Sequence, residues 1–322
     1  MSKIKIDWKF SIILISVLIL CFLPQMIRNV YWCRVFIEFF IWVVVCLGFR
    51  LILSTGELSL AQVAFMGIGA YTVGILTTRL GWNFWACWPL AGIVAAILAL
   101  IVGSVSLRIK GFYFAIATFA ISEIIRLIWI QWTSLFGGVG GIPQVPSPTA
   151  ILGLKFGSPV SFYYLSLVLA IITALIMYRL DTTRFGLTVS TFEEADNLAE
   201  SVGIHVMQYK LIAFVIASFF AGLAGALFAT FYHYIGPEDF AIHQTFYVII
   251  YALAGGAASV YGTLIGCFVI MAVLASVHVI PGYNPVWEPL ILGGILILVM
   301  KFLPGGLIAI PQRISARIME TG

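Results

Sequence analysis

Charge is scarce in this sequence. Of its 322 residues only 9% are Asp, Glu, Lys or Arg, while 62% are hydrophobic. A soluble globular protein carries roughly 25% charged residues. Thirteen acidic and 17 basic side chains cannot cover the surface that a soluble chain of this length exposes. The composition therefore excludes a water-soluble fold and predicts a polytopic membrane protein with most of its surface in lipid.

Motifs for catalysis, metal binding and nucleotide binding are also missing. The sequence contains no ATP-binding P-loop, its four histidines show no metal-ligand spacing, and no Ser or Cys lies in a nucleophile motif. The five cysteines are widely spaced in or beside apolar runs, which favours core packing over disulfides or metal ligands. The basic residues form no patch for nucleic acid. We expect no enzymatic activity, no metal and no cofactor in this chain.

Apolar runs occupy most of the chain. The first, 10–23, follows three lysines and lacks a cleavage signal, so we expect a retained first span. Further runs long enough to cross a bilayer lie near 35–53, 60–80, 83–106, 112–132, 161–178, 211–234 and 286–303. The sequence predicts an all-α protein, one transmembrane domain over residues 1–322, with about 8–10 helices and some broken or re-entrant segments.

The positive charges predict the orientation. With the N-terminus inside and alternating crossings, most Lys and Arg fall on the inner side, and only Arg28, Arg34, Arg79 and Lys155 fall outside. This asymmetry follows the positive-inside rule and predicts that both termini lie in the cytoplasm. The stretch 245–279 must then cross an even number of times or dip in and return. Either about eight crossings plus a hairpin or about ten short crossings would satisfy the rule.

Two stretches are polar enough to lie outside the membrane. The outer one, about 133–160, is rich in Gly, Pro and Ser and is expected to form a turn-rich loop or a short lid. The inner one, about 179–210, carries the most concentrated charge in the protein. Within it, Thr191 begins a T-x-x-E capping box and Gly203 lies where a helix C-cap would fall, which predicts a helix over about 192–202.

This inner helix is predicted to be amphipathic and acidic. Ala199 lies on its apolar face, and the polar face carries no Lys or Arg. The acids on it are Glu193, Glu194, Asp196 and Glu200. One interpretation is a connector on the membrane surface, but surface-lying helices are usually basic. An acidic face is better suited to docking into a groove of a cytoplasmic partner protein.

Small residues recur at intervals of four in the run 211–234. They are Ala213, Ala217, Ala221, Gly225 and Ala229, and a GxxxG pair follows at Gly262 and Gly266. Small side chains allow two helix backbones to approach closely, which is how helices associate in lipid. These positions predict helix packing and do not by themselves indicate a function.

Glu123 and Arg126 are three residues apart in an otherwise apolar run. At this spacing the two side chains share one helix face and can neutralise each other. A charge within a span could also belong to a proton relay, but the paired spacing favours a structural ion pair.

Two glycine-interrupted segments, one in each half of the chain, combine helix-breaking residues with polar side chains. Such segments are tolerated at membrane depth where they are buried in protein or line a water-filled path. The pathway candidates are Glu57, Ser59 and Gln62 in the first half, and Gly255, Gly256 and Ser259 in the second. The correspondence hints at an internal duplication around a central pathway.

Five runs match a known family in content and order: GELSLAQVAFMGIGAYT (56–72), FAISEIIRL (119–127), GGVGGIP (137–143), SVGIHVMQYKLIAFVIASFFAGLAGALFA (201–229) and GGAASVYGTLIG (255–266). In these runs the chain resembles the permease subunits of branched-chain amino-acid ABC importers, the LivM type more than its LivH partner. The likeness covers about residues 30–310.

The resemblance implies a transport subunit working by alternating access. Its partners would be a second related permease of the LivH type, two cytoplasmic ATPase subunits that bind ATP and Mg²⁺, and an extracytoplasmic binding protein that delivers a small polar solute. Lipid would surround the pair. The resemblance also implies that the inner helix is the coupling helix to the ATPase. It maps to Glu194, Ala199, Glu200 and Gly203, with Asp196 on the same segment.

The sequence departs from the family at several positions. Leu187, Ser190 and Glu193 stand where relatives usually have Arg, and Gln62 and Thr133 stand where a His and an Asp are usual. Relatives of this type also move urea, short amides and other amino acids, so the substrate stays open. Two rivals from other classes are a secondary transporter coupled to protons through Glu123 and a membrane-embedded enzyme. The acidic inner helix disfavours the first, and the missing catalytic constellation disfavours the second.

Overall fold

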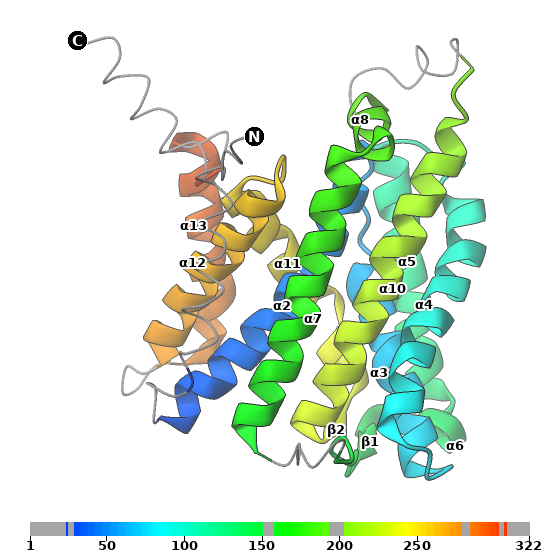
Figure 1. Ribbon diagram of the computed structural model, residues 1–322, viewed down its shortest axis with the longest axis vertical. Helices are drawn as coiled ribbons and strands as arrows, with labels where there is room; N and C mark the ends of the chain where they lie inside the picture. The colour runs from blue at the N-terminus through cyan, green and yellow to red at the C-terminus, as the bar shows by residue number, and fades with distance from the viewer. Residues whose placement is uncertain are drawn as a thin grey trace, which may run out of the picture.

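A computed structural model describes residue 24 and residues 29–150, 158–192, 203–278, 284–302 and 306–307. These residues form a helical bundle with one two-stranded sheet (Figure 1). The longer helices are α2 (Val30–Leu53), α3 (Gln62–Thr78), α4 (Phe84–Ser106), α5 (Phe112–Gln131), α7 (Pro159–Thr182), α10 (Val206–Tyr232), α11 (Ile242–Gly255), α12 (Val260–His278) and α13 (Glu288–Phe302). The short elements are α6 (Thr133–Phe136), η1 (Gly138–Gly140), β1 (Ile142–Pro143), α8 (Arg184–Ser190), β2 (Tyr234–Ile235), η2 (Pro237–Phe240) and η3 (Pro285–Trp287).

The helices have the length and hydrophobicity of membrane spans. Within the described ranges six are long and apolar enough to cross a bilayer, and α3 and the segment Glu288–Val299 are shorter apolar helices. The predicted all-α polytopic fold is confirmed. The first predicted span, 10–23, lies outside the described residues.

Helices α2 and α10 form the centre of the bundle. In their most apolar windows 83% of the α2 residues and 67% of the α10 residues are buried, against 28% in α5. A helix that is hydrophobic on all sides belongs in the interior of a membrane protein, whereas a helix at the border leaves one face to lipid or to a partner. Helix α10 packs against α2, α3 and α4, which together form the main apolar core.

The ladder of small residues lies in the contact between α10 and its neighbours. Ala213, Ala217 and Ala221 are fully buried. A Cβ atom placed on Gly225 would collide with the backbone carbonyl of Met66 on α3. On the other side of the bundle, Gly262 and Gly266 of α12 approach the backbone of α11 in the same way. At these glycines α10 therefore contacts α3, and α12 contacts α11, backbone to backbone.

Replacement of Gly225 by leucine is expected to reduce the folded yield strongly, because the new side chain would overlap the α3 backbone rather than a movable side chain. Leu223→Ile, two positions away, keeps the side-chain volume and should be tolerated. Monodisperse yield in mild detergent measures the difference. Equal yields of the two variants would contradict the close contact.

The stretch 245–279 forms the antiparallel helices α11 and α12, joined at Gly256–Ser259. The Ser259 hydroxyl accepts a hydrogen bond from the Gly262 N–H at 3.0 Å and so caps the start of α12. Arg50, near the C-terminal end of α2, contacts the turn between these helices, which places the turn at that end of the bundle. The break at Gly255 and Gly256 predicted from the sequence is therefore a sharp turn between two helices.

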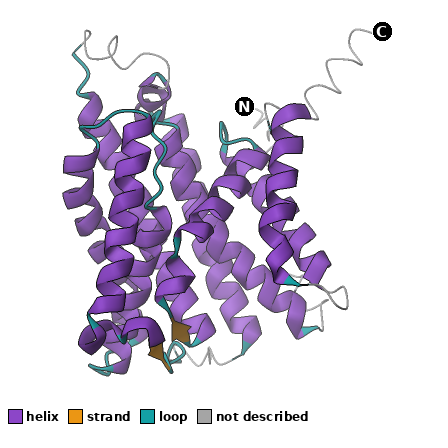
Figure 2. Cartoon of the chain, turned by 180° about the vertical axis from the view of Figure 1, so that it is seen from behind, coloured by secondary structure: helices purple, strands orange, loops and turns teal. Residues whose placement is uncertain are grey.

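The outer loop contributes the only strand pairing among the described residues. β1 pairs antiparallel with β2, with Ile142 opposite Ile235. Figure 2 shows that both strands lie at one end of the bundle, and Figure 1 places α8 at the opposite end. The strand pair attaches the loop after α5 to the connection between α10 and α11. Residues 151–157 of this loop lie outside the described residues.

Candidate translocation site

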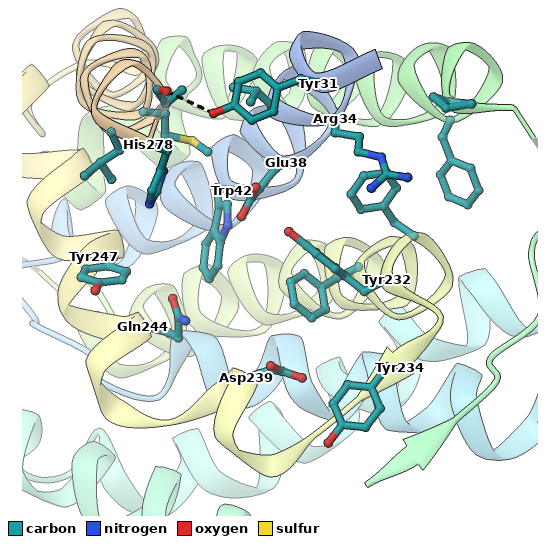
Figure 3. A pocket seen from close by; sticks show the side chains of 18 of the residues that line it. Tyr31, Arg34, Glu38, Trp42, Tyr232, Tyr234, Asp239, Gln244, Tyr247 and His278 are labelled. Carbon is teal, nitrogen blue, oxygen red and sulfur yellow. Dashed lines mark hydrogen bonds between the residues drawn. The ribbon is translucent and has the colours of Figure 1, made fainter. Parts of the chain in front are cut away.

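A cavity of about 910 Å³ lies at the end of the bundle where α2 begins and α10 ends. Its walls come from the first half of α2, the last turns of α10 and α12, the η2 segment and the first turns of α11 (Figure 3). This is the end that carries β1 and β2, which the positive-inside rule predicts to face away from the cytoplasm. Its volume falls in the range of small-molecule sites.

Side chains of both charge signs line the cavity. Arg34 and Glu38 come from α2, Asp239 from η2, and His278 and Glu288 from the ends of α12 and α13. His278 Nε2 lies 2.7 Å from Glu288 Oε1, and this contact joins α12 to α13. Arg34 and Glu38 come from neighbouring turns of α2, and Asp239 lies across the cavity from them on η2 (Figure 3). The site can therefore face a ligand that carries both a positive and a negative group.

Glu38 is the single acid in α2. Its carboxyl lies beside the Tyr232 and Trp42 side chains and within electrostatic range of His278 and Glu288. Apart from Arg34 and Arg50, the rest of its helix, Val30–Leu53, carries no charged side chain. An acid within a span usually faces an interior cavity and has a functional role.

Asp239 is held by the fold of η2. Its Oδ2 accepts a hydrogen bond from the Gly236 N–H at 2.8 Å. Burial raises the pKa of the Asp239 carboxyl, and its neighbour Glu238 raises the pKa further, while the Gly236 hydrogen bond and His243 oppose both. A cationic group bound beside it would favour the ionised carboxylate.

Aromatic side chains form the rest of the wall. Tyr31, Trp42, Tyr232 and Tyr247 all face the cavity (Figure 3). The Tyr31 hydroxyl donates to the Ala275 carbonyl at 3.1 Å, which ties the start of α2 to α12. Aromatic rings present an apolar surface and also attract cationic groups through their faces.

The six predicted pathway residues lie away from this cavity. Glu57 is 2% exposed and pairs with Lys210 at 2.9 Å, at the opposite end of the bundle. Ser59 accepts a hydrogen bond from the Ala61 N–H at 3.3 Å. Gln62 is fully buried; its Nε2 donates to the Ala217 carbonyl at 3.1 Å, and its Oε1 has no partner. Gly255, Gly256 and Ser259 form the turn between α11 and α12. In this conformation, packing and internal hydrogen bonds account for nearly all of these polar groups.

Glu123 and Arg126 lie in contact on α5, with 2.9 Å between Oε2 and Nε. Arg126 also contacts Glu238 of η2 at 2.8 Å, a residue far away in the sequence. The Glu238 side chain is 71% exposed, so one acid of this triad is open to the surroundings of the bundle. The sequence spacing predicted the Glu123–Arg126 pair, but it could not predict that Glu238, far away in the sequence, contacts Arg126.

The inner helix expected over 192–202 falls almost entirely outside the described residues, and so do Glu194, Asp196, Ala199 and Glu200. The segments on either side are described. Phe192 and Val189 pack with Val206 in a small apolar cluster separate from the main core. Gly203 has a backbone φ of +84°, the left-handed conformation expected of a helix C-cap glycine.

None of the charged or aromatic residues of the cavity was among the pathway residues predicted from the sequence. Glu38 could have been found, because it is a single acid inside an apolar run and an intramembrane acid is a default candidate for function. Asp239, His278 and Glu288 lie in or beside connections, where charge is ordinary, so only the fold brings them to Glu38. Within the described ranges no group of three or more His, Cys, Asp and Glu could hold a metal ion.

Comparison with known proteins agrees with this architecture. The profile of the family described as "Branched-chain amino acid transport system / permease component" matches residues 31–300. The chain is 30% identical to the high-affinity branched-chain amino acid transport system permease protein LivM of Salmonella typhimurium over 292 residues, covering 83% of this chain and 68% of the relative. It is 29% identical to the corresponding LivM protein of Escherichia coli K12, with the same coverage.

A more distant relative carries another name. The autoinducer 2 import system permease protein LsrC of Salmonella typhimurium is 24% identical over 270 residues, covering 80% of this chain and 73% of LsrC. No solved structure gives a significant match. Taken with the helical bundle, these matches define a multi-pass membrane permease. The chain belongs to the branched-chain amino acid transport permease family, and the resemblance seen in its sequence motifs is confirmed.

Proposed function

We propose that this chain is the membrane-spanning permease subunit of an ATP-driven importer for a branched-chain or related amino acid. The observation that carries the proposal is the cavity, which Arg34, several acids and aromatic side chains line together. An amino acid at neutral pH carries one ammonium group and one carboxylate. A site with separated charges of both signs and an apolar surface between them complements such a zwitterion.

Each part of the cavity has a role in this proposal. Arg34 binds the substrate carboxylate, because a guanidinium donates to both of its oxygens. Glu38 accepts hydrogen bonds from the ammonium group, with Tyr232 beside it. The aromatic residues Trp42 and Tyr247 contact the apolar side chain of the substrate.

The energy source and the partners are part of the proposal. ATP and Mg²⁺ would bind to two separate cytoplasmic ATPase subunits, which contact the inner loop, and an extracytoplasmic binding protein would deliver the solute to the cavity. A second related permease would complete the pathway in the bacterial inner membrane. The triad of Glu123, Arg126 and Glu238 supports a protein neighbour on α5, because charge facing lipid is unfavourable.

The test is uptake by the complex that co-purifies with this chain, reconstituted in vesicles with ATP inside and loaded binding protein outside. Glu38→Gln removes the charge that faces the ammonium group with almost no change in volume. A charge-assisted hydrogen bond is worth about 1.5–3 kcal/mol. We therefore expect the half-saturating concentration of leucine to rise by about 10- to 100-fold.

The matched control is Glu238→Gln, which makes the same chemical change in an acid that contacts Arg126 rather than the cavity. It should leave the half-saturating concentration within about twofold of the wild type, a factor equal to less than about 0.5 kcal/mol. A substrate panel of leucine, urea, a short amide and autoinducer 2 separates the solutes moved by relatives. Uptake of uncharged solutes with no response to Glu38→Gln would refute the amino-acid assignment.

A further inference from the structure

Arg50, near the C-terminal end of α2, joins three parts of the bundle. Its Nη1 contacts both carboxylate oxygens of Asp181, at 2.8 and 2.6 Å, in the last turn of α7. Its Nε donates to the Ala257 carbonyl at 3.1 Å, and its Nη2 donates to the Ala258 carbonyl at 3.3 Å. The Arg50 side chain is 5% exposed. One buried guanidinium therefore connects α2, α7 and the turn between α11 and α12.

Glu57, in the connection between α2 and α3, forms a second buried junction. Its Oε1 lies 2.9 Å from Lys210 Nζ in the first turns of α10, and its Oε2 accepts the Gly111 N–H at 3.2 Å. The two side chains of the pair are 2% and 5% exposed. This junction connects the α2–α3 connection to α10 and to the turn between α4 and α5.

The two junctions flank the inner loop. Asp181 and Lys210 lie at the two ends of this loop, about 179–210, and their partners Arg50 and Glu57 both lie in the short segment 50–57. The charges are arranged so that an exchange of partners would bring two bases together and two acids together. The pairing is therefore fixed by charge, and both ends of the loop are attached to the same segment.

Segment 50–57 begins in the last turn of α2, and the first half of the same helix forms part of the cavity wall. Glu38 lies twelve residues before Arg50 on the same helix, which corresponds to about 18 Å along the axis. A buried charge that loses its partner is strongly unfavourable, so these pairs are expected to move together rather than to separate.

We propose that the Arg50–Asp181 and Glu57–Lys210 pairs transmit movement from the inner loop to α2 and to the α11–α12 turn, and that they thereby couple ATP hydrolysis to movement of the cavity wall. The four residues are positioning residues and do not touch the substrate. The inference rests on the proposed function, because it takes the inner loop as the contact with the ATPase.

The experiment compares variants that remove a charge with variants that keep it, in the complete reconstituted complex. Asp181→Asn and Lys210→Met remove one charge each, whereas Asp181→Glu and Lys210→Arg retain the charge. The readouts are complex yield, ATP hydrolysis stimulated by loaded binding protein, and molecules of solute moved per ATP. We expect the first two variants to keep hydrolysis within about twofold of the wild type while solute moved per ATP falls at least about tenfold. Asp181→Glu and Lys210→Arg should keep most of the wild-type number of solute molecules moved per ATP.

A pair that only stabilises the fold would lower yield and leave solute per ATP unchanged, and that result would overturn the proposal. Should the charge-removing variants fail to assemble, spin labels in the otherwise wild-type complex decide the matter. Labels on Thr188 of α8 and Ser54 should keep their mutual distance between the nucleotide-free and ATP-bound states, while both shift relative to a label on Ser104 of α4. A changing distance between Thr188 and Ser54 would refute joint movement. If the wild-type complex shows no ATP-driven uptake, the proposed function itself fails, which is a different outcome.

Discussion

Gly203→Arg is expected to remove most ATP-driven uptake while the protein still inserts and ATP hydrolysis continues. Gly203 has φ +84°, and a side chain in this left-handed conformation costs roughly 1–2 kcal/mol. Among the described residues no atom lies within 4 Å of a Cβ built at this position, so the substitution adds strain and positive charge to the inner loop without a steric clash against them. Since we propose that this loop contacts the ATPase, coupling should fail before folding does.

The chain offers a matched control for this variant. Gly81, at the turn between α3 and α4, also has a left-handed φ, +65°, and open space around its Cβ position. Gly81→Arg makes the same change at the other end of the bundle and should leave uptake per ATP close to that of the wild type. Uptake and ATP hydrolysis are measured on the same vesicles. Normal coupling in Gly203→Arg would remove the support for a docking role of the inner loop.

Arg126→Gln is expected to lower the level of folded protein more than Glu123→Gln does. Loss of Arg126 leaves Glu123 and Glu238 facing each other without a base, whereas loss of Glu123 leaves Arg126 paired with Glu238. An uncompensated charge within a span costs about 3 kcal/mol. The partial exposure of these side chains, 21% for Arg126 and 25% for Glu123, reduces this figure through solvent screening.

The double variant Glu123→Gln with Arg126→Gln separates the importer from a proton-coupled transporter. A structural pair predicts that the double variant regains part of the membrane level lost in Arg126→Gln, because Glu123 no longer carries an unpaired charge and the remaining acid, Glu238, is 71% exposed. A proton carrier predicts that uptake is lost whenever Glu123 is replaced. Uptake by the wild type is also measured after an ionophore has collapsed the proton gradient. We expect uptake to continue as long as ATP is present, and uptake that needs the gradient and ignores ATP would overturn the importer.

The positions of the helices follow from local sequence. The run predicted at 83–106 is α4, Phe84–Ser106, and the run at 112–132 is α5, Phe112–Gln131. Hydrophobicity over a span length and the breaking effect of glycine act between near neighbours, so both can be read from the sequence. The spacing of the small residues on α10 also follows from a single period, although the partner helix does not.

The charged residues of the cavity and of the buried ion pairs are brought together only by the tertiary structure. Glu38 meets His278 and Glu288 only because α2 packs beside α12, and Arg50 meets Asp181 across 131 positions of the chain. Glu57 was predicted as a pathway residue because it is a polar residue in a glycine-interrupted segment; its partner Lys210 is 153 positions away and could not be predicted from that segment. Sequence alone thus determined which segments enter the membrane, because burial in lipid depends on each segment's own composition. Which charges meet, and where a cavity remains between helices, was decided by packing between distant segments, which no local pattern records.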